Sequence, residues 1–164
     1  MNELIILTPQ VVPESDILGL FQQFFEDPQD SVRMQGVDHC VAFAKHLPKH
    51  RSGPFLVPFI KKFAEDKSWR IRYLVADRLM ELSSGIGFEE AKTILVPYYV
   101  AFLTDAESEV RTAALGRMTE FCSILDKEVI ISKIVPTLKS LEQDQFVYVR
   151  CALAENLLTI CPKI

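Results

Sequence analysis

Four aspartate–arginine pairs are the residues in this chain whose types and spacing come closest to suggesting chemistry. Carboxylates act as general acids or bases, and guanidinium groups bind phosphates and carboxylates. The pairs recur at a step of 39 residues: Asp27 and Arg33, Asp66 and Arg72, Asp105 and Arg111, Asp144 and Arg150. A recurrence this regular favours one structural role repeated four times. We predict a ladder in which the arginines bind turn carboxylates, within a repeat or in its neighbour, and tie the turns together.

The other reactive side chains do not combine into a catalytic or metal-binding site. His46 and His50 are four residues apart, but Pro48 lies between them and no pair of carboxylates accompanies them. The run Asp38-His39-Cys40 has the residue types of a catalytic triad, yet consecutive helical residues point about 100° apart and cannot form a relay. Gly85-Ile-Gly87 lacks the preceding strand and the lysine of a phosphate-binding loop, and we expect a two-glycine turn between repeats there. We predict no catalytic residue, no cofactor and no metal ion.

The composition of the 164 residues is that of an ordinary folded protein, with 49% hydrophobic and 24% charged residues. The net charge of −4 and the isoelectric point near 5.4 argue against a nucleic-acid-binding surface. No apolar run reaches the roughly 20 residues that span a bilayer, and the start of the chain does not resemble a signal peptide. We expect no membrane or nucleic-acid partner, and a cytoplasmic protein with the nucleus as a second location.

The elements that must position the pairs are two helices in each repeat. In the second repeat, residues 54–65 predict the first helix, with one apolar stripe at helical spacing: Phe55, Phe59, Ile60 and Phe63. A proline recurs in this helix, at Pro58, Pro97 and Pro136, and Gly19 takes its place in the first repeat. In the third and fourth repeats it falls well inside the expected helix, which it should bend.

The second helix of each repeat follows the aspartate turn. We expect Asp30, Ser68 and Ser108 to cap it, because their side-chain oxygens can accept hydrogen bonds from its free amides. Four of its positions are apolar in every copy and predict a core column: Val32, Val37, Cys40 and Phe43; Ile71, Ala76, Leu79 and Leu82; Val110, Leu115, Met118 and Phe121; Val149, Ala154, Leu157 and Ile160.

These patterns predict an all-α fold, an α-α superhelix (solenoid) of four repeats that forms a single segment over residues 1–164. We place the repeats at about 13–48, 53–84, 88–125 and 127–162. Such arrays expose long surfaces that hold other molecules.

The residues that break the repeat pattern are the better candidates for function. Trp69 is the only tryptophan and is next to Arg70 at the second turn. Tryptophan and arginine at an exposed edge are the residue types most often found as binding anchors. The alternative is that Trp69 lies over the adjacent turn and completes the interface between repeats. Phe146 and Tyr148, near the turn of the fourth repeat, are further candidates of the same kind.

The period, the proline and the Asp…Val-Arg turn together resemble HEAT repeats. A more specific similarity is to the scaffold (A) subunit family of type-2A serine/threonine protein phosphatases. It rests on Glu65-Asp-Lys-Ser-Trp-Arg-Ile-Arg-Tyr-Leu-Val-Ala-Asp77, Gln29-Asp-Ser-Val-Arg33 and Ala106-Glu-Ser-Glu-Val-Arg111, and it extends over essentially the whole chain. In that family, the turns within repeats bind a regulatory subunit along one part of a longer array and the catalytic subunit along another.

By this resemblance the chain is a non-catalytic scaffold from the middle of a longer array. Its turns are implied to bind a regulatory subunit, and the catalytic subunit is expected to use repeats outside this sequence. The implied partner-binding residues are Asp30, Asp66, Lys67, Ser68, Trp69, Arg70, Glu107, Phe146 and Tyr148. The sequence departs from the family at Gly19 and in residues 46–53, which leaves the choice of regulatory subunit open.

Two other classes of protein share this architecture. A karyopherin-like array would use acidic residues on its concave face to capture a basic peptide. A HEAT-like enzyme acting on damaged DNA bases would need a basic concave groove, which the acidic isoelectric point opposes.

Both ends of the chain are expected to expose apolar residues. The first helix carries Phe21, Phe24 and Phe25, and the segment from Val147 to Ile160 has few polar residues. Exposed apolar area costs about 25 cal/mol per Å². We therefore expect either a fragment of a longer protein or end-to-end self-association.

Overall fold

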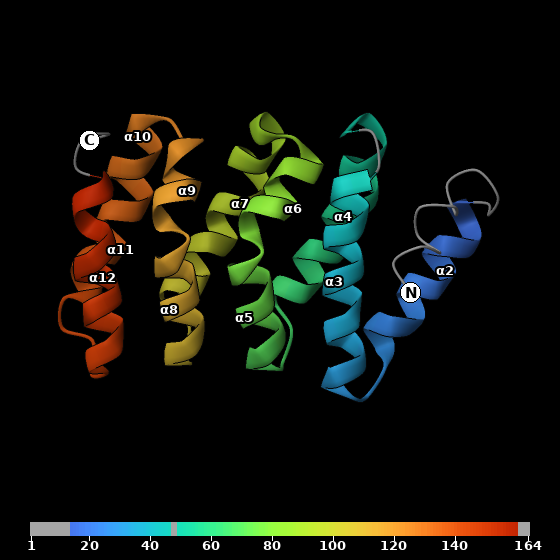
Figure 1. Cartoon of the computed structure of the whole chain (residues 1–164), viewed down its shortest axis with the longest axis horizontal. Helices are drawn as coiled ribbons and strands as arrows, with labels where there is room; N and C mark the ends of the chain where they lie inside the picture. The colour runs from blue at the N-terminus through green and yellow to red at the C-terminus, as the bar shows by residue number, and fades with distance from the viewer. Residues whose placement is uncertain (1–13, 47–48, 161–164) are drawn as a thin grey trace. The chain divides into compact units, whose positions relative to one another are not determined.

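The computed structural model describes residues 14–46 and 49–160 and is drawn in Figure 1. Every regular element in these ranges is a helix, so the all-α repeat fold predicted from the sequence is confirmed. The chain divides into two compact units, the first ending at Gly87 and the second beginning at Phe88. None of the described helices combines the length and apolar character needed to cross a membrane.

In the first unit, α3 contacts all the other described helices. The helices are α2 (Glu14–Glu26), α3 (Asp30–His46), α4 (Lys49–Ala64), α5 (Trp69–Asp77) and α6 (Leu79–Ile86). α3 packs against α2, α4, α5 and α6, and α4 also packs against α5 and α6. α5 and α6 together correspond to one expected helix, which is interrupted at Arg78.

In the second unit, α12 packs against α8, α9 and α11, and α8 also packs against α7. The elements are α7 (Phe88–Leu103), α8 (Ser108–Gly116), α9 (Met118–Ser123), α10 (Lys127–Val129), the π-helical segment η1 (Ile130–Ile134), α11 (Val135–Leu141) and α12 (Val147–Ile160).

The recurring prolines have different surroundings. Pro58 lies inside α4 and Pro97 inside α7. Pro136 instead lies near the start of α11, directly after η1. Proline has no N–H to donate to the carbonyl four residues earlier, and a widened π turn precedes Pro136. Pro136 thus lies inside a continuous helical run over residues 127–141, as expected, but this run is not a regular α-helix throughout.

Most of the predicted core column is buried. In the second and third repeats all eight positions are at most 1% exposed: Ile71, Ala76, Leu79, Leu82, Val110, Leu115, Met118 and Phe121. Val32 is only half-buried, and Ala154 and Leu157 are exposed. The last two belong to a side of α12 that the described part of its unit leaves uncovered. The column is thus incomplete in the fourth repeat, contrary to the prediction.

The phenylalanines of α2 correct a second expectation. Phe21 and Phe25 are only 3% and 6% exposed, and Phe24 is half-buried. The ring of Phe25 stacks on that of Phe59 with 4.5 Å between centroids, and Phe21 lies against Phe55 at 5.5 Å. The aromatic stripe of α4 therefore covers Phe21 and Phe25 of α2, which the sequence alone could not show.

Gly85 and Gly87 do not share the predicted two-glycine turn. Gly87 has a φ of 102° and ends α6, a conformation that glycine adopts without a steric penalty. Gly85 instead lies inside α6 and is buried. A β-carbon at Gly85 would lie 2.3 Å from Cβ of Ala44 and 2.6 Å from its Cα. Gly85 therefore permits the close approach of α6 to α3.

Candidate functional site

Each aspartate of the repeated pairs holds the turn between the two helices of its repeat. Its Oδ1 accepts a hydrogen bond of 2.8–2.9 Å from the backbone N–H two residues on: Asp27 from Gln29, Asp66 from Ser68, Asp105 from Glu107, and Asp144 from Phe146. This arrangement is an Asx turn, in which a side chain replaces one backbone partner. The turn geometry therefore depends on the aspartate column.

The helix caps expected from the sequence are corrected by this geometry. Ser68 precedes α5, but its hydroxyl makes no capping bond. Ser108 is the first residue of α8 and follows the cap position, which is Glu107. Asp30 is the first residue of α3. The serine hydroxyls instead contact neighbouring turns, where they contribute to the two surfaces described below.

Arg33 clamps two consecutive turns of the first unit. Its Nε and Nη2 donate to the two carboxylate oxygens of Asp66 at 2.8 and 3.0 Å. Its Nη1 donates to the carbonyl of Asp27 at 2.8 Å, in its own turn. The side chains of Arg33 and Asp66 are 4% and 11% exposed. The hydrogen bonds to Asp66 raise the pKa of the Arg33 guanidinium, which stays charged.

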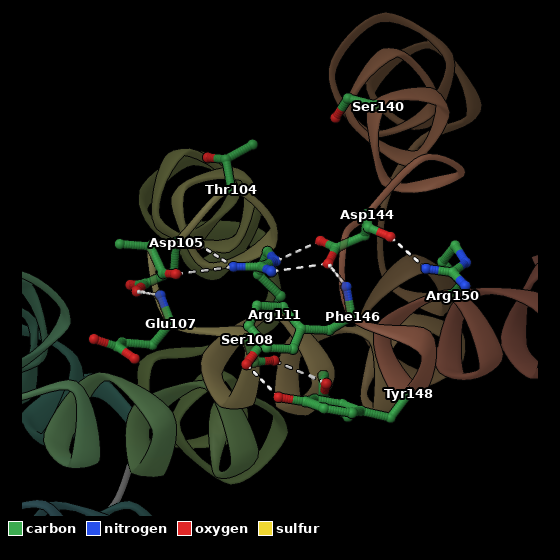
Figure 2. Close-up of polar contacts among 12 residues, drawn as sticks. Thr104, Asp105, Glu107, Ser108, Arg111, Ser140, Asp144, Phe146, Tyr148 and Arg150 are labelled. Carbon is green, nitrogen blue, oxygen red and sulfur yellow. Dashed lines mark hydrogen bonds and ion pairs between the residues drawn. The ribbon is translucent and has the colours of Figure 1, made fainter.

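Arg111 repeats this clamp in the second unit, as Figure 2 shows. Its Nε and Nη2 donate to Asp144 at 2.7 and 2.9 Å, and its Nη1 donates to the carbonyl of Asp105 at 2.7 Å. The side chains of Arg111 and Asp144 are 8% and 6% exposed. Burial alone would raise the pKa of Asp144, but the hydrogen bonds from Arg111 and from the N–H of Phe146 lower it overall.

The remaining arginines of the column close their own turns. Nη1 of Arg72 donates to the carbonyl of Asp66 at 2.8 Å, and Nη1 of Arg150 donates to the carbonyl of Asp144 at 2.6 Å. All four arginines thus bind the carbonyl of the aspartate six residues earlier. The column therefore serves as a frame for the turns.

The first turn surface consists of Asp30, Lys67, Ser68, Trp69 and Arg70. The Ser68 hydroxyl donates to Oδ2 of Asp30 at 3.0 Å, and Nη1 of Arg70 lies 3.5 Å from the same oxygen. The guanidinium of Arg70 also lies over the Trp69 ring, 4.9 Å from its centroid. Trp69 is half-buried, and the Arg70 side chain is 57% exposed. These contacts order a tryptophan and an arginine at a turn, where both remain accessible.

The pKa of the Asp30 carboxyl depends on the contacts within this surface. The pKa of Asp30 is lowered, and the hydrogen bond from Ser68 is the largest cause. Burial is the next largest effect and acts in the opposite direction, while the positive charge of Arg70 lowers the pKa further. Because the pKa is lowered in the folded state, the contribution of Asp30 to stability is present above about pH 3.9 and is lost as the pH falls through the folded value.

We predict that Ser68→Ala raises the pKa of Asp30 towards its ordinary value and weakens this acid dependence. Titration of the carboxyl carbon by NMR measures the change. Ser31→Ala is the matched control, since Ser31 gives Asp30 only a backbone hydrogen bond that alanine retains. An unchanged Asp30 titration in Ser68→Ala would contradict the assigned contact.

The second turn surface consists of Glu107, Phe146, Val147 and Tyr148. The three apolar residues are 37%, 60% and 42% exposed, and Glu107 is exposed as well. The rings of Phe146 and Tyr148 lie 5.5 Å apart. The Tyr148 hydroxyl bonds with that of Ser108, and the Arg111 guanidinium lies 5.8 Å from the centre of the Phe146 ring (Figure 2). An exposed apolar group on an ordered turn is typical of a protein-binding site.

The structure brings together most of the sequence-predicted residues within each unit. Asp66, which was predicted both for the ladder and for partner binding, belongs to the frame, because both carboxylate oxygens bind Arg33 and little of its side chain is exposed. Sequence reasoning missed Val147 and the contact between Ser108 and Tyr148. These two residues are 40 apart, one more than the repeat step, so column-by-column comparison does not pair them.

The reactive side chains of residues 14–46 and 49–160 do not form a metal-binding cluster. No group of three or more His, Cys, Asp or Glu side chains there could hold a metal ion. Cys40 is buried, and burial raises the pKa of its thiol, which disfavours the reactive thiolate. His50, which the sequence analysis considered with His46, lies in α4, but the structure does not describe its side chain.

Comparisons with known proteins agree with a helical-repeat interaction module. Residues 89–164, a little under half of the chain, match the family model described as PPP2R1A-like HEAT repeat. No curated protein sequence matches the chain. Together with the 39-residue period, the family match supports a HEAT-repeat protein, and proteins of this kind generally bind other proteins.

Solved structures share the fold. One, titled "Crystal structure of Cex1p", superposes with a TM-score of 0.73 over 99% of this chain, at 18% sequence identity. This chain spans 35% of the length of that structure. At this identity the similarity establishes the architecture alone.

Proposed function

We propose that this chain is a non-catalytic scaffold that organises a type-2A serine/threonine protein phosphatase. It binds a regulatory subunit through its turns, and the catalytic subunit joins through other repeats of the full array. In this role it acts in the cytoplasm and the nucleus. The proposal is supported by the resemblance of the turn sequences and by the PPP2R1A-like match over residues 89–164.

The observation that carries the proposal is the accessible pair Trp69 and Arg70 on a turn with a fixed backbone. Asp66 and Arg33 hold that backbone through bonds of 2.8–3.0 Å, while Ser68 and Arg70 are held by Asp30. A pre-ordered aromatic–cation pair loses little conformational entropy on binding, which favours its use as an anchor.

The test is capture of purified phosphatase regulatory and catalytic subunits by the native chain and by Trp69→Ala. We expect the variant to bind the regulatory subunit at least about tenfold more weakly, the equivalent of about 1.4 kcal/mol. Tyr73→Ala is the matched control: Tyr73 is also aromatic, lies in the same helix and is 40% exposed, but is outside the turn surface. It should bind like the native chain.

Each result bears on a different part of the proposal. If the native chain captures no regulatory subunit while a complete scaffold does so in parallel, the proposed partner is wrong. If both variants bind equally well, the partner is retained but the Trp69 anchor is wrong.

A further inference from the structure

Both turn surfaces combine a serine hydroxyl, a carboxylate that accepts its hydrogen bond, and an aromatic side chain. In the first unit, the Ser68 hydroxyl donates to Asp30. The guanidinium of Arg70 lies 3.5 Å from the same carboxylate oxygen and 4.9 Å from the centroid of the Trp69 ring. An arginine of the chain itself thus lies on the ring and faces the carboxylate.

The second unit has the serine, the carboxylate and the ring but no such arginine. The Ser108 hydroxyl donates to Oε2 of Glu109 at 2.9 Å. A hydroxyl has one proton to donate, so the bond between Ser108 and Tyr148 uses the proton of the tyrosine (Figure 2). These bonds hold the Glu109 carboxylate close to the Tyr148 hydroxyl. The position equivalent to Arg70, 39 residues on, is occupied by Glu109 itself.

The charge around this group is negative. Residues 104–109 and 142–148 contain no lysine or arginine, but they contain five acidic residues: Asp105, Glu107, Glu109, Glu142 and Asp144. Arg111, which follows the third turn, is committed to Asp144 and to the carbonyl of Asp105. Within residues 14–46 and 49–160, no lysine or arginine pairs with Glu109 or lies over the Tyr148 ring. The group is therefore complementary to a cation from outside the chain.

The exposure of the two aromatic rings follows from their place in the repeat. Phe146 and Tyr148 are 37% and 42% exposed. Their equivalents one repeat earlier are Glu107 and Glu109, which are also exposed although α12 packs against α8 beside them. These two positions thus face solvent even where another repeat is in place. Val147, whose equivalent in the third repeat is buried, is not part of the group.

We propose that Glu109, Phe146 and Tyr148 bind an arginine side chain that a protein partner supplies. The planar, weakly hydrated guanidinium stacks on the Tyr148 ring while its N–H groups reach the Glu109 carboxylate. The aliphatic stem of the arginine packs against Phe146. The hydrogen bonds through Ser108 order ring and carboxylate before binding, which lowers the entropy cost. That the partner is the regulatory subunit rests on the proposed function, whereas the choice of arginine rests on this group alone.

The test is an NMR titration of the full 164-residue chain, labelled with nitrogen-15, with a blocked pentapeptide Gly-Leu-Arg-Leu-Gly, whose only charge is the arginine. We expect the peptide to shift the amide signals of residues 107–109 and 146–149, with a Kd of about 1 mM. A peptide with lysine in place of arginine should bind about threefold more weakly, because the ammonium is more strongly hydrated. A peptide with glutamine there should bind at least about tenfold more weakly.

Variants of the chain test the assigned contacts. Glu109→Gln and Tyr148→Leu should each weaken binding of the arginine peptide by at least about threefold, and Glu109→Lys should abolish it. The matched control is Glu128→Gln, which removes another exposed carboxylate, in α10, and should bind like the native chain. The amide spectra show whether each variant is folded. Equal affinity for the arginine and glutamine peptides, no binding up to about 10 mM, or binding that Glu109→Lys leaves unchanged would each overturn the proposal.

Capture of the purified regulatory subunit by Glu109→Lys separates this proposal from the proposed function. We expect capture at least about tenfold weaker than by the native chain. A native chain that binds the arginine peptide at this group but captures no regulatory subunit would refute the proposed function and support the arginine site. Equal capture by the native chain and Glu109→Lys would refute the use of this site by the regulatory subunit and leave the proposed function intact.

Discussion

Replacing Arg111 by methionine is expected to lower the free energy of unfolding of the second unit by about 3–5 kcal/mol. The substitution preserves the bulk of the side chain but leaves the Asp144 carboxylate, whose side chain is only 6% exposed, without its cation. It also removes the hydrogen bond of 2.7 Å to the carbonyl of Asp105. The buried carboxylate would keep its hydrogen bond from the N–H of Phe146 but lose both bonds from the guanidinium. Denaturation in urea, followed by circular dichroism, measures the loss.

Arg150→Met is the matched control, because it removes the same residue type from the same repeat position. Arg150 is exposed and bridges no pair of turns, so we expect a loss below about 1 kcal/mol. Equal losses in the two variants would show that the bidentate contact with Asp144 does not stabilise the unit.

The loss in Arg111→Met should depend on pH. Asp144 has a lowered pKa in the folded native chain, so its contribution to native stability is present above about pH 3.9 and disappears as the pH falls through the folded value. In the variant the carboxylate is unpaired, and protonation relieves the penalty. The difference between native chain and variant should therefore be largest near neutral pH and shrink below about pH 4.

Gly85→Ala is expected to destabilise the first unit by about 2–3 kcal/mol, because the added methyl group overpacks a tight helix contact. The new carbon would lie 2.3 Å from Cβ of Ala44, 2.6 Å from its Cα and 3.2 Å from Cδ1 of Leu56. Backbone atoms of α3 cannot rotate away as a long side chain would, so α6 must shift. Thermal and urea unfolding would both record the loss.

Gly116→Ala provides the control for Gly85→Ala. Gly116 is also helical, but it is exposed, and a β-carbon there meets no atom within 4 Å. Alanine should therefore stabilise the helix by about 0.5–1 kcal/mol through its higher helix propensity. If Gly85→Ala were equally stabilising, the close approach of α6 to α3 would be wrong.

Much of the fold could be predicted because its signals are local or periodic. The spacing of the apolar residues in 54–65 alone predicts a helix, and the 39-residue step predicts the repeat. The hydrogen-bond partners of the serine hydroxyls and N–H groups in the turns could not be predicted so simply. The serines of the second and third turns resemble helix caps in the sequence, but backbone carbonyls accept from the N–H groups of Ile71 and Val110, and the Ser68 and Ser108 hydroxyls bond with Asp30 and Tyr148 instead.

The candidate site shows the same division. The unusual residue types at Trp69, Phe146 and Tyr148 identify them in the sequence, because each departs from its repeat column. The exposure of Val147 depends on which side of α12 is covered. The Asp66 carboxylate is bound by the guanidinium of Arg33, which is 33 residues away in the chain. Neither property can be read from the residues themselves.

The all-α repeat array and the equivalence of its positions follow from the residues alone, since both depend on period and polarity. Which equivalent residues have the same surroundings depends on how the helices pack. Arg111 and Arg150 occupy one column, yet one is buried in a bidentate pair and the other presents an open edge to solvent. The reason is physical: spacing along the chain sets where a side chain lies on its helix, but burial and pairing depend on what packs against that helix.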